Sequence, residues 1–175
     1  MNAENLLEAF AVIAGLKQPG MACVHAEDLA MCVDGMARLR AAKNPTTLVD
    51  WTLSSPDGAE AEAVRLSAST AQKTGARVYI VHLTSALGLG AVRKARASGI
   101  PLHCESTSTN LFYDNEDPAG MKLKRHPPIR TSADRAALWT GVADGSIETI
   151  GTDNVTANAE ESNFTGTFWE NRGGM

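Results

Sequence analysis

The sequence predicts an α/β fold in which four parallel strands alternate with helices. Four short runs rich in β-branched and other apolar residues are separated by longer stretches whose apolar residues recur at helical spacing. Glycine and proline stand at most of the junctions, as turns require. A helix before each strand suits a right-handed crossover, so successive strands are expected to be parallel. The predicted strands are 21–25, 77–83, 100–105 and 147–152.

The predicted helices combine helical spacing of apolar residues with end signals at their boundaries. Gly75 stands just past one helix, as a helix C-terminus favours. Thr131 and Asp134 have the spacing of a capping box at the start of another helix. Glu27 and Asp28 suit a first helical turn because acids there complement the helix dipole. The predicted helices are 3–16, 27–43, 57–74, 85–98 and 131–143.

Three segments lack periodicity and are predicted to be irregular: a loop at 46–56, a long loop at 106–130 and a tail at 155–175. A loop as long as the second is usually either functional or a misassigned element. With 175 residues the chain is long enough to bury a real core. We therefore expect residues 1–175 to form a single domain.

Composition and charge argue against several classes of function. The net charge is −4 and no cluster of lysine and arginine occurs, so we expect no nucleic-acid or membrane-surface partner. No apolar run approaches the ~20 residues that span a bilayer. Cys23, Cys32 and Cys104 show no CxxC spacing and are interpreted as free thiols, with Cys23 and Cys104 buried. Free thiols and the absence of a signal-peptide pattern predict a cytoplasmic protein.

Residue types that bind metal ions end three of the predicted strands. His25 and His82 stand at the ends of the first two strands, and Asp153 follows the last. These ends meet at one edge of a parallel sheet, where α/β proteins place their chemistry. Imidazole and carboxylate are ligands of Zn²⁺, which makes hydroxide available near neutral pH. We therefore predict a metal-dependent hydrolytic site. The alternative, that each histidine is an ordinary strand-end residue packed under a loop, stays open on these residues alone.

The other two histidines are interpreted differently. His103 stands before the end of its strand and should point to the opposite side from Cys104, in a structural role or behind the metal ligands. His126 lies in the long loop, where it either contacts substrate or faces solvent. No phosphate-binding glycine pattern and no nucleophile-elbow context is present, so the serines are discounted as nucleophiles.

With these residues identified, the chain resembles the cyclic amidohydrolases, the family of dihydropyrimidinase and hydantoinase, with allantoinase and dihydroorotase as near relatives. The similar segments follow the family's order over nearly the whole chain. They are Val24-His25-Ala26-Glu27 (similar to the family's VHAE strand end), 59–63 with 78–85 (its next helix and second histidine strand), Pro127-Pro128-Ile129-Arg130 with 137–145 (its PPLR, LW and DG stretch), and Gly151-Thr152-Asp153 (its catalytic aspartate strand).

The resemblance implies a TIM-like barrel with a binuclear metal centre, usually of zinc, that opens cyclic amides or imides such as hydantoins and dihydropyrimidines. It implies that His25 and His82 bind one metal ion. Asp153 would bind the other and pass a proton to the leaving amide nitrogen. His126 replaces the small residue, often serine, that precedes the paired prolines and helps to bind the substrate ring. Asn154 replaces the histidine that commonly follows the aspartate, and we assign both positions to substrate binding.

By the same resemblance the chain corresponds to family strands five to eight, a partial TIM-like barrel of about four strands with flanking helices. The HxH pair of the family's first strand and the carboxylated lysine of its fourth have no counterpart in the sequence. We therefore expect little or no activity from the chain alone, and association through its open sheet edges, as a homo-oligomer or otherwise. An alternative from another class is a non-catalytic half-barrel that pairs with itself or with a full-length paralogue.

Overall fold

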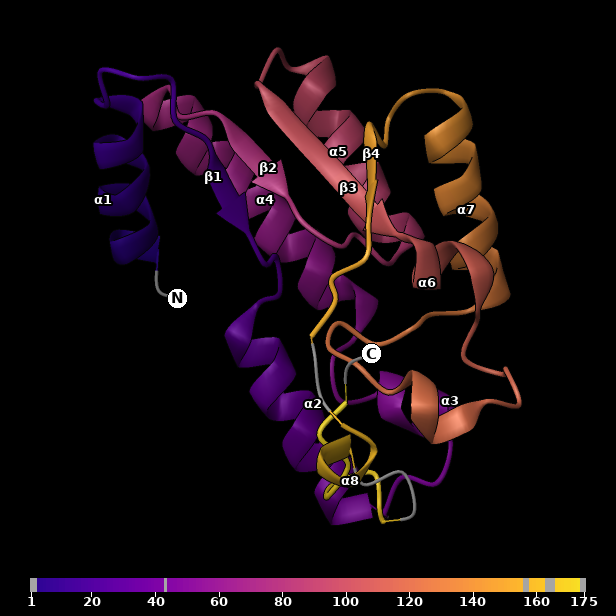
Figure 1. Ribbon diagram of the computed structural model, residues 1–175. Helices are drawn as coiled ribbons and strands as arrows, with labels where there is room; N and C mark the ends of the chain where they lie inside the picture. Colours follow the sequence, from indigo (N-terminus) through magenta and orange to yellow (C-terminus); the bar gives the residue numbers. More distant parts are fainter. Residues whose placement is uncertain (1–2, 43, 156–157, 163–165, 174–175) are drawn as a thin grey trace.

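The computed structural model describes residues 3–42, 44–155, 158–162 and 166–173, and its centre is a parallel four-stranded sheet (Figure 1). The strands, in the order β1-β2-β3-β4 across the sheet, are β1 (Ala22–Val24), β2 (Val78–Ile80), β3 (Leu102–Thr107) and β4 (Thr149–Gly151). Each strand pairs with the next in sequence, and all pairs are parallel. The predicted α/β fold with four parallel strands is therefore confirmed.

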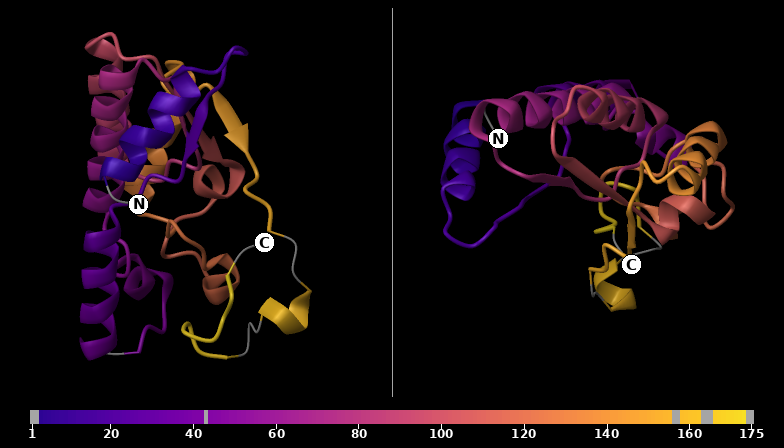
Figure 2. Two further views of the ribbon diagram at one scale, coloured as in Figure 1. Left: turned by 90° about the vertical axis from the view of Figure 1, so that its left-hand side faces the viewer. Right: turned by 90° about the horizontal axis from the view of Figure 1, so that it is seen from above.

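Helices cover one face of this sheet. Seen from above, they form an arc with the strands on its inner side (Figure 2). The long predicted helix of 57–74 has the expected bounds, and Ser85 and Thr131 cap the next two predicted helices through their side chains. The helices of the described residues are α1 (Ala3–Ala14), α2 (Leu29–Ala42), α3 (Leu48–Thr52), α4 (Asp57–Thr74), α5 (Ala86–Ala97), α6 (Ser108–Phe112), the 3₁₀ helix η1 (Gly120–Leu123), α7 (Ser132–Ala143) and α8 (Ala159–Ser162).

The main hydrophobic core lies between the sheet and the helices α4 and α5. Val78 and Ile80 of β2 are fully buried there, as are Leu89 and Val92 of α5. Burying each such side chain away from water stabilises the folded state by about 1.5–3 kcal/mol. A second group of buried residues, the Trp51 cluster, lies below the sheet in Figure 1. It consists of Leu39, Leu48, Trp51, Leu123, Ile129 and Phe168.

The opposite face of the sheet is more polar and open. Side chains alternate along a strand, so the neighbours of the core residues face away from α4 and α5. On this side Cys23, Tyr79 and His103 lie next to one another in register, and Cys23 is exposed. The prediction that Cys23 is buried is therefore wrong, because an apolar run does not reveal which face the helices cover. Cys104 faces the helices and is buried as predicted.

The strand at the β4 edge is shorter and more exposed than predicted. Only Thr149–Gly151 have strand geometry, and Ile150 is 53% exposed. Within the described residues β4 pairs with β3 alone, so one edge of β4 has no backbone partner from the sheet. Ile147, just before the strand, is buried against the main core. A strand was therefore predicted at the right position, 147–152, but the prediction that it is buried is wrong.

All three segments predicted to be irregular contain regular structure within their described residues. The helix α3 lies within 46–56, where Thr47 and Asp50 form a capping box that the sequence interpretation missed. The predicted long loop at 106–130 includes the end of β3, then α6 and η1. The wrong start of the predicted loop at 106 is explained by Thr107, because Thr107 ends β3 and its hydroxyl accepts a hydrogen bond from the Asn110 N–H to start α6. The tail from 155 contains the short α8 within its described residues.

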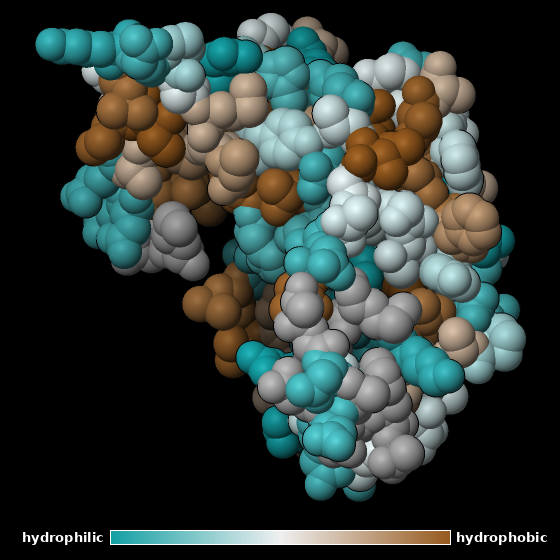
Figure 3. All heavy atoms as spheres, viewed as in Figure 1, coloured by the Kyte–Doolittle hydropathy of each residue, from teal (hydrophilic) through white to brown (hydrophobic). Residues whose placement is uncertain are grey.

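Several apolar side chains remain exposed on the helices near the open left side of the molecule in Figure 1. Val12 belongs to α1 and Leu16 follows it, while Leu29 and Val33 belong to α2. Each of these four side chains is more than half exposed. Figure 3 shows the corresponding hydrophobic areas over α1 and α2.

The helix α2 begins at Leu29, not at the predicted Glu27. Among the described residues no helix is both long enough and apolar enough to cross a bilayer.

A close approach between α4 and α5 fixes the turn that follows β2. Glu60 of α4 is 1% exposed, and its carboxylate accepts hydrogen bonds from the backbone N–H and hydroxyl groups of Thr84 and Ser85. Gly88 in the first turn of α5 leaves room for this carboxylate, because a Cβ atom there would overlap it. A Cβ atom at this glycine would also lie within 3.0 Å of Leu83 Cδ1.

We expect Gly88→Ala to destabilise the protein by about 1–3 kcal/mol, because the new methyl group overpacks a site already filled by Glu60. Gly90→Ala in the same helix is the matched control, since no atom lies within 4 Å of the position that its new Cβ atom would take. That change should stabilise the helix by up to about 1 kcal/mol. Urea unfolding of both variants measures the difference, and equal stabilities would contradict the packing argument.

Candidate metal centre

The structure brings the two predicted strand-end histidines into direct contact. His25 follows β1 and His82 lies two residues beyond β2. His25 Nδ1 lies 2.9 Å from His82 Nε2, and the ring centroids are 4.6 Å apart at an interplanar angle of 72°. His82 is 6% exposed and has a φ of 41°, a left-handed conformation that is uncommon for a residue with a side chain. Backbone strain of this kind is concentrated at functional sites.

Asp153 lies at the same edge of the sheet but does not complete a cluster with the imidazoles. It follows β4 by two residues, is exposed, and also has a left-handed φ, of 50°. Its charge favours protonation of both His25 and His82. Across the residues that the structure describes, no group of three or more potential ligand side chains is close enough to hold a metal ion. The strand ends therefore form a pair of imidazoles with a carboxylate nearby.

The two imidazoles have opposite electrostatic surroundings. The hydrogen bond from His25 Nε2 to Glu27, 2.7 Å long, raises the pKa of His25, and burial offsets part of this effect. Burial, followed by the neighbouring His25, lowers the pKa of His82. For Glu27, burial is the largest influence and opposes ionisation, but hydrogen bonds from His25 and Ser55 outweigh it and lower the pKa of the carboxyl. His25 thus gains a proton more readily than His82.

The imidazole pair fits one edge of a tetrahedral metal site. Two nitrogen ligands at the usual Zn–N distance stand about 3.3 Å apart, so a separation of 2.9 Å needs to open by only a few tenths of an ångström. The pair itself needs a shared proton, because two lone pairs at this distance repel each other. His82 Nδ1, on the other side of its ring, is buried and has no hydrogen-bond partner among the described residues. Two imidazoles alone do not close a coordination sphere.

The remaining predicted residues come from three different segments: the stretch after β4, the stretch before α7, and β3. Asn154 is exposed next to Asp153. His126 is exposed, and its ring lies 5.0 Å from that of Trp51. His103 hydrogen-bonds Glu148 at 2.8 Å from the open face of the sheet and contacts neither of the paired histidines, in agreement with a structural role. The assignment of His126 and Asn154 to substrate binding stays a prediction.

Sequence interpretation missed the residues that support the pair. Glu27, expected in a helix, instead contacts His25, and its other oxygen accepts a hydrogen bond from the Ser55 hydroxyl. Arg130 then joins the backbone carbonyl of Ser55 to the hydroxyl of Thr84. A signal was present, because Glu27 and Arg130 belong to two of the quoted motif segments. Ser55 had none, since its role depends on a contact with a residue 28 positions away.

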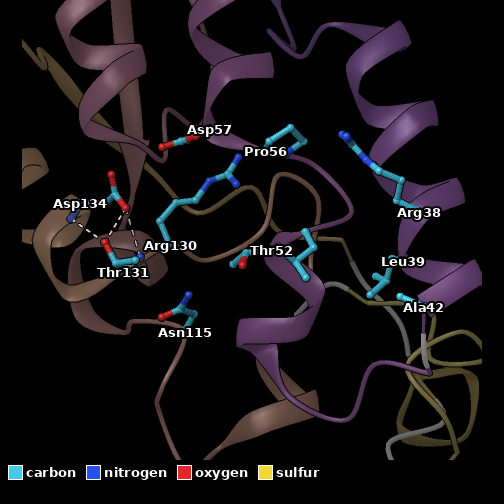
Figure 4. Close-up of a pocket in the computed structure, with 12 residues that line it drawn as sticks. Arg38, Leu39, Ala42, Thr52, Pro56, Asp57, Asn115, Arg130, Thr131 and Asp134 are labelled. Atoms are coloured by element: carbon cyan, nitrogen blue, oxygen red, sulfur yellow. Dashed lines mark hydrogen bonds between the residues drawn. The ribbon is translucent and has the colours of Figure 1, made fainter.

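A cavity of about 470 Å³ lies on the far side of this network, between α2, α3 and the first turns of α4 and α7 (Figure 4). Arg130 lines it, together with apolar side chains such as Leu39 and Pro56. Neither His25, His82 nor Asp153 contributes to its wall. The cavity is therefore distinct from the imidazole pair, although Arg130 connects the two regions.

Comparison with known proteins finds sequence similarity to an allantoinase, a dihydroorotase and a D-phenylhydantoinase. No protein-family model matches the chain. An allantoinase from Enterococcus faecalis is 29% identical over 168 residues, which are 93% of this chain and 37% of the allantoinase. A dihydroorotase from Latilactobacillus sakei is 30% identical over 91% of this chain and 36% of its own length. A D-phenylhydantoinase from Escherichia coli is 41% identical over 110 residues, or 59% of this chain and 23% of that enzyme.

Solved structures give the same result for the fold. An L-hydantoinase (dihydropyrimidinase) from Arthrobacter aurescens superposes with a TM-score of 0.90 over 99% of this chain, at 25% identity. A D-hydantoinase from a Thermus species superposes with a TM-score of 0.87 over the whole chain, at 24% identity. In both cases the match covers 39% of the other chain. The resemblance to cyclic amidohydrolases is confirmed, and the matches cover between 23% and 39% of the length of these relatives.

We expect the two imidazoles to titrate on opposite sides of the ordinary histidine range in metal-free protein. The pKa of His25 should lie above 6.5 because of Glu27, and that of His82 below 6.5 because of burial and of His25. As pH falls, His25 therefore becomes charged first. Imidazole chemical shifts followed by NMR across the titration measure both values, and the reverse order would contradict the geometry of the pair.

Proposed function

We propose that this chain is part of a metal-dependent hydrolase of cyclic amides or imides, in which His25 and His82 hold one metal ion. The observation on which the proposal depends is the contact of two strand-end imidazoles at 2.9 Å. The similarity to an allantoinase, a dihydroorotase and hydantoinases supports ring opening at a C–N bond as the reaction. The proposed fold of the complete enzyme is a TIM-like barrel, of which residues 1–175 form strands five to eight.

Each residue of the site has a proposed task. His25 and His82 bind through the nitrogens that face each other, Nδ1 and Nε2. A bound zinc ion supplies Lewis-acid polarisation of the ring carbonyl and an activated water. Asp153, exposed at the same edge, accepts a proton from the attacking water and returns it to the leaving ring nitrogen. His126 and Asn154 contact the substrate ring, and hydantoins and dihydropyrimidines are the proposed substrate class.

Further ligands are needed for full activity. In the described part of the chain no third ligand side chain joins the imidazole pair, so we propose that zinc binds weakly to the 175 residues alone. A weakly held ion in an open site gives little turnover, because the reacting water and the substrate are not fixed relative to each other. The natural sources of the missing groups are further strands beside the exposed edges of β1 or β4, or a second copy of the chain.

The zinc proposal is tested by titrating metal-free protein with zinc in a calorimeter. His25→Asn and His82→Asn should each weaken binding at least tenfold, or by about 1.4 kcal/mol, because each removes one of two ligands. His103→Asn is the matched control, since His103 lies on the open face and bonds to Glu148. Equal affinity in all three variants would place the zinc elsewhere and remove the basis of the proposed site.

The substrate proposal is tested by mixing the zinc-loaded chain with dihydrouracil and with hydantoin and following loss of the ring by ultraviolet absorbance. We expect turnover to be slow or undetectable for the chain alone. Activity should appear, and depend on Asp153, when polypeptide corresponding to the rest of a relative is supplied. Rapid turnover by the purified chain alone would contradict the proposal that the site needs further ligands.

A further inference from the structure

We propose that Glu27, braced by Ser55, is a positioning residue that holds the His25 imidazole with Nδ1 turned toward His82 and toward a metal ion bound there. The inference deepens the proposed function, because the metal ion belongs to that function. The orientation of the ring, however, is a property of the metal-free protein and is measurable without zinc.

The two nitrogens of His25 have different partners. Nε2 lies 2.7 Å from Glu27 Oε2, and Nδ1 lies 2.9 Å from His82 Nε2. An ionised carboxylate only accepts hydrogen bonds, so Nε2 of His25 retains its hydrogen and donates it to Glu27. The lone pair of neutral His25 is then on Nδ1 and faces His82. A carboxylate in this position fixes both the tautomer and the plane of a metal-binding imidazole.

Glu27 is itself held from its second oxygen. Its side chain is 8% exposed, and Oε1 accepts a hydrogen bond from the hydroxyl of Ser55, which is 1% exposed. Ser55 in turn is fixed by Arg130, whose Nη1 donates to its carbonyl oxygen and whose Nε donates to Thr84. With both oxygens occupied, the carboxylate has no freedom to follow a rotating ring. Rotation of His25 therefore breaks the hydrogen bond to Glu27.

Stability alone does not account for this arrangement. The His25 side chain is 50% exposed, so water would satisfy Nε2 without any protein partner. Burying a carboxylate beside a half-exposed histidine adds little to folding stability. The desolvation of the carboxylate is costly, and solvent screens its attraction to the imidazole. What the contact does provide is a single orientation of the ring. That orientation matters only if something is to be bound at Nδ1.

The test uses ¹⁵N-labelled protein in five forms: wild type, Glu27→Ala, Glu27→Gln, Ser55→Ala and the control Glu62→Ala. Glu62 is an exposed acid of α4 that pairs with Arg65 and contacts none of these residues. The first measurement, without metal, is the His25 Nε2–H signal, which a hydrogen bond to Glu27 shifts and protects from exchange. The second is titration with zinc, recording both affinity and which ring nitrogen shifts on binding.

We expect wild type and Glu62→Ala to show the protected Nε2–H signal and to bind zinc through Nδ1 of His25 and Nε2 of His82. Glu27→Ala should lose the signal and bind zinc about 10- to 100-fold more weakly. Glu27→Gln should recover part of both, because its amide oxygen accepts from Nε2 in the same place. Ser55→Ala should have a smaller effect in the same direction, since it frees one carboxylate oxygen.

An unchanged Nε2–H signal together with wild-type zinc affinity in Glu27→Ala would overturn the inference. If wild type itself binds no zinc at His25 and His82, the proposed function fails, and the metal-free signal still decides the inference: loss in Glu27→Ala supports it and retention overturns it. If Glu27→Ala does not fold, as judged by its thermal transition, Glu27→Gln and Ser55→Ala decide by the same measurements. Wild-type behaviour in both of those variants would also overturn it.

Discussion

The buried carboxylate of Glu60 is the constraint on which the candidate site depends. It lies in the helix-covered layer and accepts four hydrogen bonds from Thr84 and Ser85, which come after His82 in the turn between β2 and α5. Burial raises the pKa of Glu60, and the charge of Arg130 and these donors offset part of that effect. A buried acid is tolerated only when its acceptors are satisfied in this way, so the turn after His82 has little freedom to adopt another course.

The same constraint extends to the other histidine through side chains from distant parts of the sequence. Arg130 contacts both Thr84 and Ser55, and Ser55 contacts Glu27, which orients His25. This chain of contacts begins at Thr84, beside His82, and returns to His82 through the 2.9 Å contact between the two imidazoles. His25 and His82 are 57 positions apart in the sequence. Removing one member leaves its buried neighbours without partners, which costs more than the loss of one hydrogen bond. The closed path explains how two short strands present their end residues in a fixed relation.

Sequence patterns predicted the parts of this structure that are determined locally. The helix at 57–74, the cap at Ser85 and the capping box at Thr131 follow from neighbouring residues, and the structure has them as expected. The position of His25 and His82 at one edge of the sheet followed from the rule that parallel strands end together, whereas their direct contact was not predicted. Burial of Cys23 and the loop at 46–56 were predicted wrongly, because they depend on which sheet face is covered and on a cap signal that was overlooked. The link from Glu27 to Ser55 has no local signal at all.

The Trp51 cluster gives the lower part of the molecule a small core of its own, distinct from the main core against the sheet. Its members come from α2, α3, η1, the segment before α7 and the tail, and Phe168 of the tail is 2% exposed within it. The indole N–H of Trp51 donates to the carbonyl of Arg125, next to His126. Because local opening follows such packing units, we expect opening of this small core to expose the tail and the segment before Pro127 while the main core stays closed. Amide hydrogens around Trp51 should then exchange by a smaller opening than those of β2.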